Sequence, residues 1–512
     1  MRAARLICLA TVAAALLLPA SHAAGDTTGS TLLGRAILPS DAYQPGPVSG
    51  AAVAPVNGVT PPFPGQPIPG FSAVLDAGHG EFWGMPDNGY GAKTNSADFL
   101  LRLYRIRPEF RTARGGSGDV DVLGSLSLRD PDRRVPFALT RADRLLTGAD
   151  FDLESVRRAK DGTFWFGEEF GPFLLHTDAT GKVLEAPFEL PGARSPQNPY
   201  LTSPDAWTIG QSRGFEPMAR SIDGKTLYPM LEGALRNDPD PRRRIINEFD
   251  LRAKRYTGTT WSYQTDAAFP KAVIGDLTAV DEHRFVLIER DDDQGAAARQ
   301  KKIYLVDLRR TDASGYLVKR LVLDLLTIGD PDGISTPARP GEFGVGNPFS
   351  FPLQSVESLE VLGGERLLIA SDNNYPGSDG RWIARDRPDD TELIVVHAPR
   401  LRERPVDAAP RPRERPVDSD RGSARTLAVI GDIPYGAAQI AAFPAEIGEI
   451  NADPDVDRVL HLGDIKNGSS RCDDAYFAAR LADFETFEDP LVYTPGDNEW
   501  TDCHRASNGG YL

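Results

Sequence analysis

The chain has 512 residues, of which 40% are hydrophobic, and a formal net charge of −16 at neutral pH. This length allows two or three domains with ordinary packed cores. The acidic balance argues against a nucleic-acid partner, because phosphate backbones recruit basic surfaces, and it favours cationic ligands.

The N-terminus has the features of a secretory signal. Residues 1–5 carry two arginines, residues 6–20 are mostly apolar, and the small-residue motif Ser-His-Ala ends at Ala23. This order predicts a signal peptide over residues 1–23. No later segment reaches the roughly 20 apolar residues that a membrane span needs. We therefore expect a secreted or periplasmic protein without a stable membrane anchor.

Residues 24–70 form the next predicted part of the chain. Residues 31–38 (TLLGRAIL) alternate enough to form a strand, which could close a ring of strands by joining the last repeat described below. Residues 43–70 are dense in proline and glycine. This composition predicts an extended, poorly packed arm.

A repeat occupies the middle of the chain. A short strand pattern begins near Ser72, Glu154, Glu216, Asp276 and Glu357, turns, and continues into a second apolar strand that ends in acidic residues. Further strand candidates follow each pair. Four strands per repeat, short turns and little helical periodicity indicate a mainly β fold, a β-propeller. Five repeats are visible, and six blades stay open as an alternative.

The acidic residues of the repeat are candidate metal ligands. The first strand of each propeller blade lines a central channel, so Glu154, Glu216, Asp276 and Glu357 would converge there. Carboxylates that converge need a compensating positive charge, which a calcium ion would supply. The alternative is that they cap strand ends. The acids that end the second strands fit solvated turns individually: Asp87, Glu168, Glu169, Glu232, Glu289 and Asp372.

The repeat region resembles the family named for the esterase-like activity of phytase. The resemblance rests on residues 87–106, on residues 151–184 and on GFEPMARSIDGKTLYP at residues 214–229, and we place the domain at residues 71–398. It implies a secreted, calcium-compatible propeller that hydrolyses esters or phosphate esters. It supplies no catalytic residue set, so the catalytic residues stay unknown.

A linker and a terminal domain follow. Residues 399–424 repeat RERPVD twice among Pro, Arg and Asp, which predicts a mobile tether. Within residues 425–512, apolar strands alternate with amphipathic helices in βαβαβ order, as a parallel sheet requires. Cys472 and Cys503 both lie here, and in an oxidising compartment they favour a disulfide over a metal-ligand role.

Three strands of the terminal domain end in a glycine followed by a carboxylate. Asp432, Asp464 and the pair Asp497-Asn498 occupy these positions, where parallel sheets bind ligands. The motifs resemble the calcineurin-like metallophosphoesterases, α/β sandwiches with a two-metal site of the iron, manganese or zinc type. The resemblance implies that these four residues bind metal. Asp432 is followed by Ile433-Pro434 rather than by a histidine two positions on, so the domain is expected to be incomplete, as a fragment or a degenerate copy.

These observations favour an exported, metal-dependent hydrolase of a small-molecule phosphate ester. The competing hypothesis is a non-catalytic propeller that binds a cation or another ligand and carries a phosphoesterase remnant. The sequence does not decide whether the protein is an enzyme, and it leaves the oligomeric state unknown.

Overall fold

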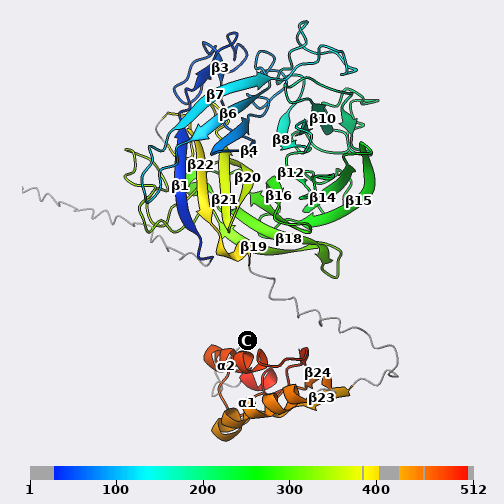
Figure 1. Cartoon of the computed structure of the whole chain (residues 1–512), viewed down its shortest axis with the longest axis vertical. Helices are drawn as coiled ribbons and strands as arrows, with labels where there is room; N and C mark the ends of the chain where they lie inside the picture. The colour runs from blue at the N-terminus through cyan, green and yellow to red at the C-terminus, as the bar shows by residue number, and fades with distance from the viewer. Residues whose placement is uncertain (1–27, 383–385, 403–425, 454–455, 505–512) are drawn as a thin grey trace, which may run out of the picture. The chain divides into compact units, whose positions relative to one another are not determined.

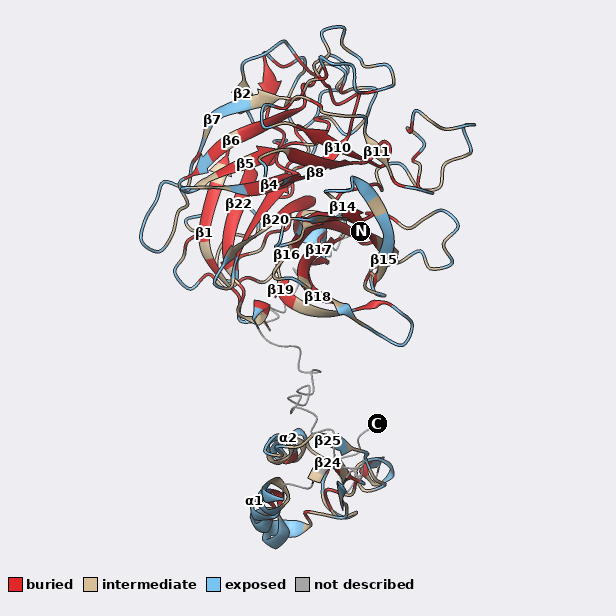
Figure 2. Cartoon of the chain, turned by 45° about the vertical axis from the view of Figure 1, so that its right-hand side comes forward, coloured by how far each residue is buried: buried red, intermediate tan, exposed pale blue. Residues whose placement is uncertain are grey.

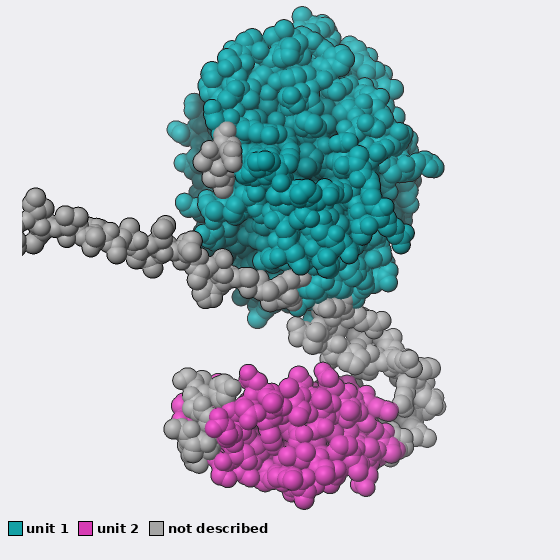
Figure 3. Space-filling model, turned by 90° about the vertical axis from the view of Figure 1, so that its left-hand side faces the viewer, with its two compact units in different colours: residues 1–403 teal, residues 404–512 magenta. Residues whose placement is uncertain are grey.

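The computed structural model describes residues 28–382, 386–402, 426–453 and 456–504. The chain divides into two compact units, residues 1–403 and 404–512, which Figure 3 colours separately. The predicted signal peptide lies outside the described residues, and so does nearly all of the predicted linker. Among the described residues, no helix is long and apolar enough to cross a membrane.

The first unit is a β-propeller whose blades are antiparallel four-stranded sheets. From the inner to the outer strand, the first blade has β4 (Ala73–Gly78), β5 (Glu81–Met85), β6 (Arg102–Pro108) and β7 (Val120–Ser127), and the second has β8 (Leu153–Arg158), β9 (Phe164–Glu168), β10 (Phe173–Thr177) and β11 (Phe188–Glu189). The third blade has β12 (Met218–Arg220), β13 (Thr226–Pro229), β14 (Arg243–Asp250) and β15 (Arg255–Gln264), and the fourth has β16 (Val273–Ala279), β17 (Arg284–Arg290), β18 (Lys301–Thr311) and β19 (Leu317–Asp324). The fifth blade has β20 (Ser355–Gly363), β21 (Arg366–Asp372), β22 (Thr391–His397) and, as its outer strand, β1 (Thr31–Leu38). Short 3-10 turns lie at Gly295–Ala297 and Pro399–Leu401.

The ring of blades closes within the described residues. The inner strands β4, β8, β12, β16 and β20 contact one another in that order, and β20 returns to β4, as the centre of Figure 1 shows. The expected β-propeller is therefore confirmed with five blades, and the six-blade alternative is wrong, because β20 leaves no gap next to β4. Strand β1 pairs antiparallel with β22, from Thr31 opposite His397 to Leu38 opposite Thr391. The predicted closing strand is thus the outer strand of the last blade.

Apolar side chains pack between neighbouring blades. One cluster joins Leu103 of β6 to Phe166 of β9, and another joins Met230, just after β13, to Leu287 of β17. Figure 2 shows the inner and middle strands as largely buried. Strands buried on both faces favour runs of Val, Ile, Leu and Phe, as in FWFGE of β9. The blades therefore stabilise one another around the channel.

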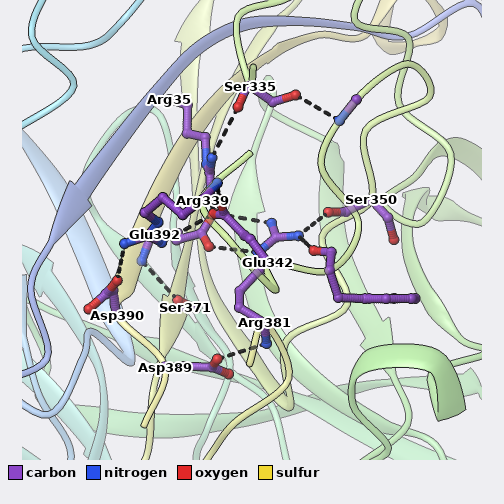
Figure 4. A network of polar contacts seen from close by, with 12 residues as sticks. Arg35, Ser335, Arg339, Glu342, Ser350, Ser371, Arg381, Asp389, Asp390 and Glu392 are labelled. Carbon is purple, nitrogen blue, oxygen red and sulfur yellow. Dashed lines mark hydrogen bonds and ion pairs between the residues drawn. The ribbon is translucent and has the colours of Figure 1, made fainter. Parts of the chain in front are cut away.

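A buried ionic network fastens the closing strand (Figure 4). Glu392 of β22 accepts hydrogen bonds from Arg35 Nε at 3.0 Å and from Arg381 Nε at 2.7 Å. The Glu392 and Arg381 side chains are both fully buried. Burial opposes ionisation of Glu392, but Arg35 and Arg381 lower its pKa to about 2. The network thus keeps a buried carboxylate charged where the two ends of the propeller chain meet.

The proline-rich segment packs better than its composition predicts. Strands β2 (Tyr43–Gln44) and β3 (Gln66–Pro67) pair antiparallel. Phe63 is 1% exposed, and its ring packs against Tyr43, Tyr90 and Tyr375. Gln66 Oε1 accepts a hydrogen bond from Leu100 N at 2.7 Å. A few aromatic and amide side chains therefore anchor this segment to the blades, although proline and glycine dominate its composition.

The second unit has the predicted βαβαβ order: β23 (Thr426–Ile430), α1 (Gly436–Ala452), β24 (Val456–His461), α2 (Asp474–Phe484) and β25 (Leu491–Tyr493), followed by a 3-10 turn at Thr501–His504. The three strands are parallel and lie in that order. In the described part of this unit they form a single small sheet. The metallophosphoesterase sandwich expected from the sequence is therefore not supported, although the predicted order of strands and helices is confirmed.

Candidate metal centre

The acids of the repeat meet at one end of the channel because each inner hairpin is antiparallel. The start of an inner strand then lies beside the end of the second strand, as Leu153 lies opposite Glu168 and Ser355 opposite Asp372. Residues near these positions form what we call the acidic mouth: Asp87, Asp152, Glu154, Glu169, Glu216, Glu232, Glu357 and Asp372.

Two groups within the acidic mouth are close enough to hold an ion. Asp87, Asp152 and Glu154 each place a carboxylate oxygen within 4.8 Å of the other two, and Glu169, Glu216 and Glu232 do the same. Asp87 is half-buried, whereas the other members of both groups are buried.

Two buried oxygens in these groups have no hydrogen-bond partner: Asp152 Oδ1, in a residue that is 3% exposed, and Glu169 Oε1, in one that is 2% exposed. An unpartnered buried carboxylate oxygen is costly unless something positive faces it. Hard oxygen donors of this kind suit calcium. The residues present therefore fit a divalent cation.

Two arginines are paired with the acidic mouth in the described part of the chain. Arg290 Nη2 lies 2.7 Å from Glu357 Oε1 and 3.3 Å from Glu216 Oε1. Arg213 Nη1 lies 2.7 Å from Glu232 Oε2. The carboxylates outnumber these cations, and neither arginine has an ion pair with Asp87, Asp152 or Glu154 within the described residues. The excess of negative charge is therefore greatest in that group.

Burial makes the acidic mouth hard to ionise. It raises the pKa of Asp87 to about 7, against the hydrogen bond from Gly89 N. It also raises the pKa of Asp152, Glu154, Glu169 and Glu216 well above the usual range, with repulsion from neighbouring carboxylates as a further cause. A bound cation would oppose both effects, because it favours the ionised form of its carboxylate ligands.

The predicted propeller ligands are only partly brought together. Glu154 and Glu216 belong to the two groups, and Glu357 lies beside them, bound to Arg290. Asp276 does not join them: its Oδ1 accepts from Arg157 Nη2 at 2.8 Å and its Oδ2 from Leu359 N at 2.9 Å. The pairing of β16 with β17 is irregular between Ile274 and Leu277, but β8 and β20 have a comparable irregularity beside Glu154 and Glu357. What sets Asp276 apart is its buried ion pair with Arg157.

Sequence reasoning missed several acids of the mouth. Taken individually, Glu169, Glu232 and Asp372 were expected to be solvated turn residues, but in the structure each is only 2% exposed. Asp152 was not singled out. The signal was present in the pairing, since an acid at the start of one strand and another at the end of its antiparallel partner meet at the same edge.

The terminal carboxylates lie at one edge of the small parallel sheet. Asn498 N donates to Asp464 Oδ1 at 3.1 Å, and its Nδ2 donates to Tyr435 Oη at 3.2 Å. Tyr435 Oη donates to Asp432 Oδ1 at 3.1 Å. Burial and the charges of Glu499, Asp497 and Asp432 raise the pKa of Asp464. Within the described residues these acids form no triad as close as those of the acidic mouth.

The two cysteines of this unit are joined. Cys472 and Cys503 form a disulfide with their Cα atoms 5.7 Å apart. The bond ties the segment before α2 to the turn after β25. It therefore stabilises the loops that carry Asp464 and Asp497.

Comparison with known proteins points to the propeller. The model of a phytase-like family, described as "Esterase-like activity of phytase", matches residues 66–375, more than half of the chain. An uncharacterized secreted protein of Arthroderma benhamiae is 26% identical over 286 residues, which cover 42% of this chain and 56% of the relative. The match thus spans little more than half the length of that relative.

Solved structures are similar only at low sequence identity. A luciferin-regenerating enzyme is 12% identical, with 63% of this chain and 76% of that chain covered and a TM-score of 0.30. A calcium-binding protein, regucalcin, from Agrobacterium tumefaciens is 13% identical, with 64% and 92% covered and a TM-score of 0.31. The family match ends at residue 375 and so does not extend to residues 425–512.

Proposed function

We propose, from the premise that this chain belongs to the phytase-like family, that it is an exported hydrolase of small-molecule phosphate esters that works with divalent cations at the acidic mouth. The observation that carries the proposal is the pair of buried carboxylate triads with unpartnered oxygens on Asp152 and Glu169. Calcium suits this all-oxygen donor set best. The secreted relative supports export.

Different residues of the acidic mouth would have different roles. Asp87, Asp152 and Glu154 would hold one cation, and Glu169, Glu216 and Glu232 a second. Buried Arg290 keeps Glu216 and Glu357 in place. When bound, a divalent cation acts as a Lewis acid toward a phosphoryl oxygen.

Arg213 is suited to binding the phosphoryl group. Its side chain is 39% exposed, and among the described residues its hydrogen bonds to Glu232 and to the Ser212 carbonyl both come from Nη1. A guanidinium at the rim of an acidic site can orient a phosphate through two parallel hydrogen bonds. It would thereby counter the repulsion between an anionic substrate and the carboxylates.

Hydrolysis of p-nitrophenyl phosphate by the full chain tests the proposal. We expect turnover that needs added calcium, stops with chelator and is lost in Glu154→Gln and Glu216→Gln. Glu282→Gln is the matched control, because the Glu282 side chain is 87% exposed. Asp464→Ala separates the two units: loss of turnover in that variant alone would place the chemistry in the terminal unit and overturn the proposal.

In a second candidate function, the propeller binds a cation but catalyses no reaction. The excess of buried carboxylates would also suit a propeller that binds calcium for ligand recognition. Calorimetric calcium uptake by the full chain, without hydrolysis of mono- or diesters under any metal, would favour this binder. Absence of uptake of calcium, manganese, zinc or iron would refute both candidates.

A further inference from the structure

A small pocket adjoins the acidic mouth. Its volume is about 200 Å³, and it lies between the proline-rich segment, the loop after β5 and the loop after β21. Asp87 belongs both to the pocket wall and to the first carboxylate triad. Since Asp87 is the half-buried member of its triad, the pocket lies on the solvent side of that triad.

Hydrogen bonds across the pocket hold its walls together. Ser49 Oγ lies 2.8 Å from Tyr90 Oη, and Tyr43 Oη lies 2.6 Å from Tyr375 Oη. Asn57 Nδ2 donates to the Pro376 carbonyl at 3.0 Å and to that of Gly377 at 2.9 Å. Three segments that are distant in sequence are thereby fixed, so the pocket is formed before any ligand arrives.

The lining of the pocket is mainly apolar and contains no basic side chain within the described residues. Val53, Val56, Tyr90, Tyr375 and Pro376 are its apolar and aromatic members, and Asp87 and Asn374 are its polar ones. Additional phosphate groups of a polyphosphorylated substrate would find no basic side chain there to pair with. An aromatic ring or a short alkyl chain would instead be desolvated against valine, proline and the tyrosine ring.

The size of the pocket limits its occupant. Sites that enclose a whole drug-sized ligand measure roughly 300–1,000 Å³. A pocket of about 200 Å³ accommodates one part of a substrate. Because Asp87 borders the proposed cation site, that part is the group attached to the phosphoryl oxygen.

We propose that this pocket binds the alcohol portion of the substrate and selects phosphate monoesters of aromatic or apolar alcohols over polyphosphorylated polyols. The inference rests on the proposed function, because the acidic mouth must hold the phosphoryl end. Tyr90, Val53 and Val56 are then specificity-determining residues.

Paired substrates test the selectivity. We expect kcat/KM for 1-naphthyl phosphate to exceed that for glycerol phosphate and for inositol hexakisphosphate by about tenfold or more, as a filled apolar subsite allows. Val56→Asp places a charge on the pocket wall, where Val56 is 41% exposed, and should lower this ratio, although the better leaving group of the aryl ester keeps it above one. The control is Val318→Asp on β19, since Val318 is 39% exposed and lies outside the pocket; its ratio should match the wild type.

A binding measurement separates this inference from the proposed function. With calcium present, calorimetry compares 1-naphthylphosphonate with methylphosphonate, neither of which can be hydrolysed as an ester. Tighter binding of the naphthyl compound that Val56→Asp abolishes supports the pocket even if no ester is turned over. Equal binding of the two compounds, or a preference for inositol hexakisphosphate, overturns it.

Discussion

Calcium binding at the acidic mouth should release protons. Burial raises the pKa of Asp87 to about 7, so at pH 7 this carboxyl is about half protonated. Burial and neighbouring carboxylates also raise the pKa of Asp152 and Glu154 well above the usual range, in the same direction as for Asp87. A cation needs the ionised form of its ligands. Each calcium bound by this triad should therefore displace at least about half a proton at pH 7, and more at lower pH.

Isothermal calorimetry in two buffers of different ionisation enthalpy measures this release. The apparent heat should differ between the buffers in proportion to the protons displaced, and the calcium affinity should fall as the pH falls through 7. Asp152→Asn should reduce the number of protons released, whereas the exposed control Glu282→Gln should not. Calcium binding with the same heat in both buffers would refute the assignment of these carboxyl groups as ligands.

Two further predictions concern stability. Glu392→Gln removes the counter-charge of buried Arg381 and one of the two carboxylates that face Arg35, the other being Glu342, so the free energy of unfolding in denaturant should fall by about 3–5 kcal/mol. Because the pKa of Glu392 is lowered to about 2, its contribution is present above pH ~4.3 and is lost as the pH falls toward 2; a pH-independent difference between variant and wild type would contradict this. The Cys472–Cys503 bond spans 31 residues, so the Cys472→Ser/Cys503→Ser pair should destabilise the terminal unit by about 4 kcal/mol in thermal unfolding, and an unchanged transition would contradict that value.

The fold was largely predictable because the same strand pattern recurs in every blade. The closing role of residues 31–38 followed from their alternation, and β1 pairs with β22 as expected. Blade number was left open because a sequence shows strands, whereas the closure of the ring depends on the contact of β20 with β4.

The candidate site was less predictable. Glu154, Glu216 and Glu357 were found from their position in the repeat, but Asp276 forms a buried ion pair with Arg157 instead. Arg157 is 119 residues away in sequence, so the repeat pattern alone does not show this partner. The burial of Glu169 likewise depends on the neighbouring blade.

The pairing of β1 with β22 also constrains how the chain folds. Strand β1 is synthesised early, but its partner lies more than 350 residues later, as the contact of Arg35 with Glu392 shows. During that interval the N-terminal strand presents an open edge, which can pair with another chain. Folding is therefore most vulnerable to aggregation just before the fifth blade is complete, and a chaperone that shields β1 would raise the yield of folded protein.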